Sequence, residues 1–148
     1  MATIRRFEDL EIWQLSRKLC QVIHSYIDRK EFAKDYKLVN QINGASGSVM
    51  DNIAEGFDRG SRKEFLNFLG IAKGSCGETK SQLYRAVDRK YISENDFQSA
   101  YAVADEINRK IYGLMKYLNS SETKGQKYIN RVEESEALYG NIEFDFED

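Results

Sequence analysis

The chain has 148 residues, of which 41% are hydrophobic and 31% are charged, and its formal net charge is −2 at pH 7. This is the length of one domain, and the hydrophobic content is sufficient for a core, which excludes wholesale disorder. The longest stretch without a charged residue, from Leu38 to Met50, is shorter than the roughly 20 apolar residues of a membrane span, which excludes a transmembrane helix.

The lack of an expected targeting signal and the pattern of cysteines both indicate a cytoplasmic protein. No apolar run follows Arg5-Arg6, so a signal peptide or membrane anchor is not expected. Cys20 and Cys76 lack the spacing of a metal or redox motif, and we predict that both are buried, reduced thiols. Because His24 is the single histidine, the usual zinc sites and di-iron sites cannot be assembled, and no metal or other cofactor is expected.

The absence of proline and the scarcity of strand-forming residues favour an all-α fold. The apolar spacing predicts a first amphipathic helix over about residues 7–29. A second helix is predicted over about residues 35–57, with Gly56 and Gly60 ending it. Its apolar stripe includes an asparagine, Asn52.

The third predicted helix, about residues 61–90, has the clearest pattern. A capping box formed by Ser61 and Glu64 marks its start. Its core seam, with a spacing of three or four residues, comprises Phe65, Leu69, Ala72, Cys76, Thr79, Leu83 and Ala86. A second line beside that seam comprises Phe68, Ile71, Ser75, Glu78 and Gln82. Two buried faces on one helix predict that the chain forms an oligomer.

A fourth helix is predicted over about residues 93–118, from the apolar positions Phe97, Tyr101, Ala104, Ile107, Ile111, Leu114 and Leu118. Short connections make neighbouring helices antiparallel, so residues 1–118 are predicted to form an up-down-up-down four-helix bundle. Residues 119–148 are strongly acidic and show no clear period. They are predicted to form a flexible, mostly irregular tail with a short helical piece near 133–138.

Polar residues on these seams are interpreted as structural. A hydrogen-bonded network that fixes register between helices and between subunits is predicted to involve Asn52, Glu55, Ser75 and Glu78. The small residues 44–48 indicate close helix approach, because they lie in a helix and no phosphate-loop lysine follows them. An enzyme that uses Glu55 and Glu78 as paired carboxylates is a less favoured alternative.

Dibasic pairs occur along the chain, and most are expected to lie on solvated helix faces. Two clusters could contact phosphates if an oligomer repeated them as a ring. The candidate nucleic-acid-binding residues are Arg59, Arg62 and Lys63 before the third helix, and Arg85, Arg89 and Lys90 at its end.

Several motifs resemble a known family. They are Phe7-Glu8-Asp9-Leu10-Glu11-Ile12-Trp13-Gln14, Gln41-Ile42, Ser48, Asn52-Ile53-Ala54-Glu55-Gly56, Ser61-Arg62-Lys63-Glu64-Phe65, and Gly74-Ser75 with Glu78. Over about residues 5–118 they resemble the four-helix bundle proteins named for the open reading frame in 23S ribosomal RNA intervening sequences. The resemblance implies a bacterial protein and a homopentamer of antiparallel bundles. That family is similar in turn to the accessory variability determinant proteins of diversity-generating retroelements, which bind nucleic acid and partner with a reverse transcriptase.

We therefore expect a non-enzymatic, oligomeric helical scaffold that contacts RNA, DNA or a nucleic-acid-processing protein and no membrane. Asn43 and Gly44 stand where the family commonly has basic residues, which weakens the case for RNA. A protein-interaction module without nucleic-acid binding is the main alternative. The salt dependence of binding separates the two, because only phosphate contacts release counterions.

Overall fold

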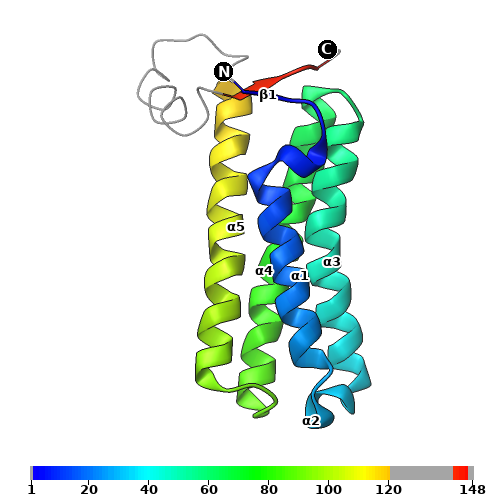
Figure 1. Ribbon diagram of the computed structural model, residues 1–148, viewed down its shortest axis with the longest axis vertical. Helices are drawn as coiled ribbons and strands as arrows, with labels where there is room; N and C mark the ends of the chain where they lie inside the picture. Colours follow the sequence, from blue (N-terminus) through cyan, green and yellow to red (C-terminus); the bar gives the residue numbers. More distant parts are fainter. Residues whose placement is uncertain (1, 121–141, 147–148) are drawn as a thin grey trace.

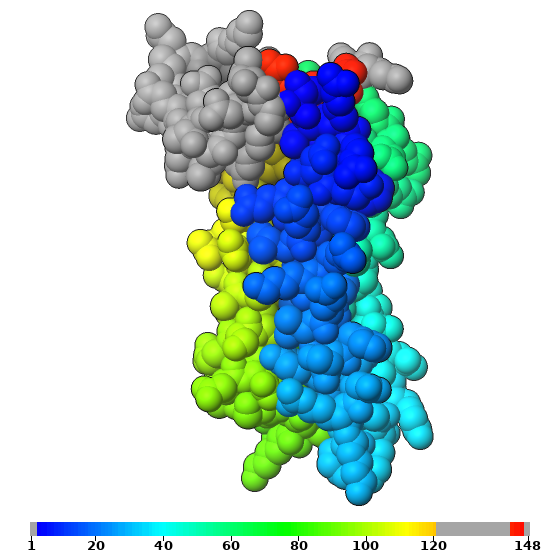
Figure 2. Space-filling view, viewed as in Figure 1, coloured from blue at the N-terminus to red at the C-terminus, as the bar shows by residue number. Residues whose placement is uncertain are grey.

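The computed structural model describes residues 2–120 and 142–146 and shows four long helices in an elongated bundle (Figure 1). In chain order the elements are β1 (Ala2–Ile4), the 3-10 turn η1 (Phe7–Asp9), α1 (Glu11–Ile27), α2 (Lys30–Ala33), α3 (Tyr36–Asp58), α4 (Arg62–Asp88), α5 (Glu94–Ser120) and β2 (Ile142–Phe144). Each long helix runs antiparallel to the one before it, and α1 and α4 each pack against both α3 and α5. Figure 2 shows the face on which α1 lies between α5 and α3. The predicted all-α four-helix bundle is confirmed.

Apolar side chains on the inner faces of the helices form one continuous core. Every residue of the seam predicted for the third helix is fully buried in α4. The apolar positions predicted on α5 are also buried, except for the half-buried Tyr101. On α3 the buried stripe passes from Val49 to Ile53, and Asn52 lies half-buried beside it, toward α4. Helical periodicity therefore predicted which face of α4 and α5 turns inward.

The N-terminal part differs from the predicted first helix. Phe7–Asp9 form a 3-10 turn, and Leu10 has an extended backbone, so α1 begins only at Glu11. A second difference follows α1, where the short helix α2 had not been predicted and buries Phe32 completely. Both differences lie in short segments, where apolar spacing covers too few turns to define a period.

The C-terminal residues include a strand that had not been predicted. β2 pairs with β1 in parallel, from Ala2 opposite Ile142 to Ile4 opposite Phe144, at the end of the bundle where both termini lie (Figure 1). Phe144 and Phe146 are half-buried. This short segment is therefore held against the bundle, whereas the helical piece predicted near 133–138 lies outside the described residues.

Candidate functional site

A chain of polar side chains joins α3 to α4 in the middle of the bundle. Ser48 Oγ lies 2.9 Å from Ser75 Oγ, and Asn52 Nδ2 donates to the hydroxyl and to the carbonyl of Ser48, each at 2.8 Å. The structure thus brings Asn52 and Ser75 together through Ser48, which had not been assigned to the predicted network. Because a buried hydroxyl is costly without a partner, these contacts favour one axial register of the two helices.

The helices α3 and α4 approach each other closely at Gly56, one turn beyond Asn52. A Cβ added at Gly56 would lie 2.5 Å from the Cβ of Phe68 and 3.3 Å from the ring of Phe65. The Cβ of Phe68 is bonded to the backbone and cannot swing away. Only glycine therefore fits here without moving the two helices apart.

The two carboxylates of the predicted network lie outside it. Glu55 is exposed and pairs with Arg59 at 2.9 Å, and Glu78 is exposed on α4. The contact between Ser48 and Ser75 places these two residues at the same height along the bundle axis. Glu55 lies seven residues beyond it on α3, and Glu78 three residues beyond it in the opposite direction, which separates them by about 15 Å along the axis. Paired carboxylates act at roughly 5–9.5 Å, so the pair of the enzymatic alternative is not assembled.

The second line predicted on α4 is only partly buried within the chain. Ser75 and Gln82 are buried, Phe68 is half-buried, and Ile71 is 52% exposed. Among the described residues, Gln82 Oε1 is buried without a hydrogen-bond partner. Much of this line therefore packs inside the bundle, and its outward part is Ile71 and Glu78.

Four glycines in the helices face open space, and we call them the open glycines. A Cβ added at Gly44, Gly47, Gly74 or Gly77 would have no neighbour within 4 Å. Close packing within the chain, predicted for residues 44–48, is therefore wrong for its two glycines. Each glycine destabilises a helix by up to about 1 kcal/mol relative to alanine, and no contact among the described residues offsets that cost.

The structure separates the two predicted basic clusters. They lie at opposite ends of α4, about 40 Å apart at 1.5 Å per residue. Arg59 pairs with Glu55 at 2.9 Å, and Arg89 pairs with Asp35 at 2.7 Å. The other members lie at the same two ends: Arg62 and Lys63 in the first turn of α4, and Arg85 and Lys90 around its last turn. The clusters do not form a continuous basic strip on the bundle.

Asp35 connects several groups at the end of the bundle that carries α2. Its carboxylate caps α3 by accepting the N–H of Leu38 at 3.1 Å, and it accepts from the hydroxyl of Tyr91 at 2.9 Å and from Arg89 at 2.7 Å. These donors, the Leu38 N–H first, hold the pKa of Asp35 below its usual range. The carboxylate form therefore stabilises the fold.

We expect Asp35→Asn to lower the free energy of unfolding at pH 7 and to make it less sensitive to acid. A carboxyl with a lowered pKa stabilises the fold above its unfolded pKa of about 3.9, and this is lost as the pH falls through the folded pKa. Urea unfolding at pH 7 and pH 3 should therefore show a difference from wild type that shrinks at pH 3. Asp28→Asn serves as the control, because the Asp28 side chain is exposed. An unchanged difference at the two pH values would contradict the prediction.

Aromatic rings lie along one half of the surface where α4 packs against α5. Tyr84 is 51% exposed, and its ring centre lies 4.7 Å from that of Phe97 and 5.8 Å from that of Tyr101. Lys80 Nζ lies 4.7 Å from the centre of the Tyr101 ring and 3.1 Å from the carboxylate of Asp105. Burial opposes the charge of Lys80, but hydrogen bonds with Asp105 and Tyr101 raise its pKa above the ordinary value. Lys80 is therefore positively charged near pH 7, and these contacts hold its ammonium group in place.

The other half of this surface places a tyrosine near two lysines. Tyr112 is 55% exposed, and its ring centre lies 6.0 Å from Lys73 Nζ and 5.3 Å from Lys116 Nζ. Arg109 pairs with Asp105 at 3.2 Å between the two halves. We call this surface the tyrosine–lysine face; its members are Lys73, Lys80, Tyr84, Tyr101, Asp105, Arg109, Tyr112 and Lys116.

Sequence reasoning missed the tyrosine–lysine face because its members come from two helices. The signal that could have revealed it is the spacing of Lys73 and Lys80, seven residues apart and so on one side of α4. Their tyrosine neighbours belong to α5, and which side of α5 they share depends on how the two helices pack. The candidate nucleic-acid-binding residues were instead predicted from adjacent basic pairs, although adjacent residues point in different directions on a helix.

Neither cysteine is placed for chemistry. Cys76 Sγ donates to the carbonyl of Ala104 at 2.9 Å, and Cys20 Sγ to the carbonyl of Ser46 at 3.2 Å. Burial raises the pKa of Cys76 to about 11 and that of Cys20 above its ordinary value, so little thiolate forms near pH 7. Cys76 is buried as predicted, whereas Cys20 is half-buried. Over residues 2–120 and 142–146, no metal-binding group of three or more His, Cys, Asp or Glu side chains occurs, and no helix is suited to crossing a membrane.

These features define a small antiparallel four-helix bundle protein with a polar seam between α3 and α4 and an aromatic, basic surface where α4 packs against α5. The chain belongs to the 23S rRNA-intervening sequence protein family, whose sequence profile matches residues 8–113. This confirms the resemblance seen in the motifs. A protein of unknown function from the S23 ribosomal protein family of Bacteroides thetaiotaomicron VPI-5482 has a similar solved structure, with a TM-score of 0.64 and 24% identity over 71% of this chain and 98% of that chain. No curated protein matches the sequence.

Proposed function

We propose that the chain is a non-enzymatic scaffold that self-associates and binds single-stranded nucleic acid. The observation that supports nucleic-acid binding is the tyrosine–lysine face. Proteins bind single strands by stacking bases on aromatic rings and by pairing phosphates with lysine and arginine. Tyr84 and Tyr112 offer half-exposed rings in the two halves of this face, and each half contains lysine.

The charge and shape of this face suit a short stretch of nucleic acid. The face carries four cations, Lys73, Lys80, Arg109 and Lys116, and Asp105 pairs with Lys80 and Arg109, whereas the chain as a whole has a net charge of −2. From Lys73 to Tyr84, α4 rises about 16 Å, a length that several nucleotides can follow. Gly74 and Gly77 lie on α4 between these two residues and leave space beside the helix. A phosphate backbone can therefore approach α4 closely.

Self-association is supported by Gly44 and Gly47, the open glycines of α3, and by Ile71, which is 52% exposed on α4. A helix of a second copy that packed against the glycine backbones would offset their cost in helix stability. The homopentamer implied by the family resemblance is one assembly of this kind. A non-enzymatic role is supported by the separation of Glu55 from Glu78 and by the raised pKa values of both thiols.

A salt titration with a fluorescent single-stranded RNA of about 12 nucleotides tests the proposal. With about three net phosphate contacts, we expect the affinity to fall by about 20-fold between 50 and 200 mM salt. Tyr112→Ala should weaken binding by about 1–3 kcal/mol through lost stacking. Lys73→Gln should weaken it and reduce the salt slope by about 0.7. Fluorescence anisotropy measures both effects.

Tyr36→Ala is the matched control, because Tyr36 is 74% exposed at the start of α3, outside the tyrosine–lysine face. It should leave RNA binding unchanged. Binding that does not depend on salt, or that is equally weakened by Tyr36→Ala and Tyr112→Ala, would favour the protein-interaction alternative. The solution mass of the same samples tests self-association, and the mass of a single chain at micromolar concentration would contradict it.

A further inference from the structure

The end of the bundle that carries both termini is closed by a cluster of aromatic rings. Phe65 is fully buried, and its ring centre lies 5.9 Å from that of Phe57, 6.0 Å from that of Phe144 and 6.1 Å from that of Phe146. Phe144 and Phe146 stack nearly parallel at 5.4 Å. We call Phe57 and Phe65 the aromatic acceptor, because the other two rings reach them from the far end of the sequence.

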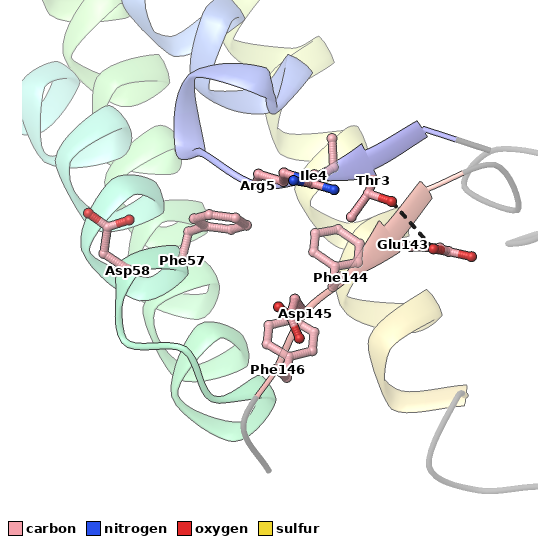
Figure 3. Close-up of a pocket in the computed structure, with 9 residues that line it drawn as sticks. All are labelled: Thr3, Ile4, Arg5, Phe57, Asp58, Glu143, Phe144, Asp145 and Phe146. Atoms are coloured by element: carbon pink, nitrogen blue, oxygen red, sulfur yellow. Dashed lines mark hydrogen bonds between the residues drawn. The ribbon is translucent and has the colours of Figure 1, made fainter.

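The segment 142–146 is held against this acceptor like a bound peptide. β1 and β2 pair over three residues, and Thr3 Oγ1 donates to Glu143 at 3.4 Å. An isolated two-stranded pair is marginally stable in water, so the rings of Phe144 and Phe146 supply much of the attachment. A half-open cavity of about 670 Å³ remains between this segment, β1 and the end of α3 (Figure 3). The segment therefore docks without becoming part of a closed core.

The number of residues between α5 and β2 is large enough for the segment 142–146 to reach beyond its own bundle. α5 ends at Ser120 and β2 begins at Ile142, and both points lie at the same end of the bundle (Figure 1). Residues 121–141 connect them, and a chain of that length can extend to roughly 70 Å. The segment can therefore reach the acceptor of a neighbouring molecule.

We propose that residues 142–146 of one copy dock on β1 and the aromatic acceptor of a second copy, so that subunits are linked by exchanged C-terminal strands. The exchange costs little, because each contact within one chain is replaced by the same contact between chains. We assign a second copy of this chain as the partner, because the structure already shows that residues 142–146 fit the surface formed by β1 and the aromatic acceptor. The proposal does not depend on nucleic-acid binding, since the tyrosine–lysine face lies on α4 and α5 and takes no residue from either strand.

A disulfide between copies tests the exchange. Thr3 and Glu143 are direct partners in the β1–β2 register, so cysteines at these positions are close enough to be joined. Full-length Thr3→Cys chain is mixed with full-length Glu143→Cys chain and mildly oxidised, so that a disulfide between these two positions can form only between molecules. We expect the mixed dimer to exceed each same-variant dimer several-fold on a non-reducing gel.

Two controls make the result specific. Adding Phe144→Ser and Phe146→Ser to the Glu143→Cys chain should remove the excess of mixed dimer, because the segment loses the rings that dock it. Glu143→Cys chain mixed with wild type accounts for disulfides through the native Cys20 and Cys76. A mixed dimer no more abundant than the same-variant dimers, or one that survives the serine substitutions, would overturn the proposal.

Discussion

Replacing Gly56 with alanine is expected to lower the free energy of unfolding by about 1–3 kcal/mol, because the new methyl group overfills a closed interface. It would lie 2.5 Å from the Cβ of Phe68, an atom that no change of rotamer can move. The helices α3 and α4 must then separate near the contact that joins Ser48 to Ser75. The better helix propensity of alanine offsets up to about 1 kcal/mol of a larger clash. Urea unfolding followed by circular dichroism measures the change.

Gly77→Ala is the matched control, because the same methyl group on α4 would meet no atom within 4 Å. At the same low protein concentration it should raise the free energy of unfolding by up to about 1 kcal/mol through helix propensity alone. The two substitutions are chemically identical and should therefore have opposite signs. A Gly56→Ala chain as stable as the Gly77→Ala chain would show that the helices can move apart without loss, contrary to the tight approach at Gly56.

The inward face of α4 could be predicted from the sequence because its determinants are local. A seam from Phe65 to Ala86 at alternating spacings of four and three residues spans many helical turns, and all of its members are buried. Ser61 was identified as a cap from its spacing to Glu64, and its hydroxyl accepts the Glu64 N–H at 3.3 Å. Patterns within one helix thus predicted the core and the start of α4.

Contacts between elements could not be predicted in the same way. Glu78 shares a line with Ser75 along α4, but it points outward because Ser75 already lies at the edge of the contact with α3. Gly56 belongs to a family motif and was predicted to end the second helix, but α3 continues to Asp58. The physical reason for this glycine, the Cβ of Phe68, appears only when α3 and α4 are placed together. The strand at 142–144 depends on β1, nearly the whole chain away, so no local period could reveal it.

Replacing Phe65 with alanine is expected to lower the free energy of unfolding by about 3–5 kcal/mol, which is a large share of the 5–15 kcal/mol of a typical domain. Phe65 is fully buried in the first turn of α4, where it contacts the rings of Phe57, Phe144 and Phe146. Removing it leaves a cavity and also removes the surface on which the C-terminal rings rest. We therefore expect a second effect, the release of β2 from β1, which hydrogen exchange of the β1 amides measures.

Phe97→Ala separates the two effects, because Phe97 is a buried ring in the first turn of α5, at the opposite end of the bundle (Figure 1). Its loss should destabilise the fold by a similar amount, about 3–5 kcal/mol. Under native conditions, however, the β1 amides should exchange as slowly as in wild type, whereas in Phe65→Ala they should exchange faster. If both variants accelerated exchange in β1 equally, the strand would be reporting global stability, and Phe65 would have no special part in docking the C-terminal segment.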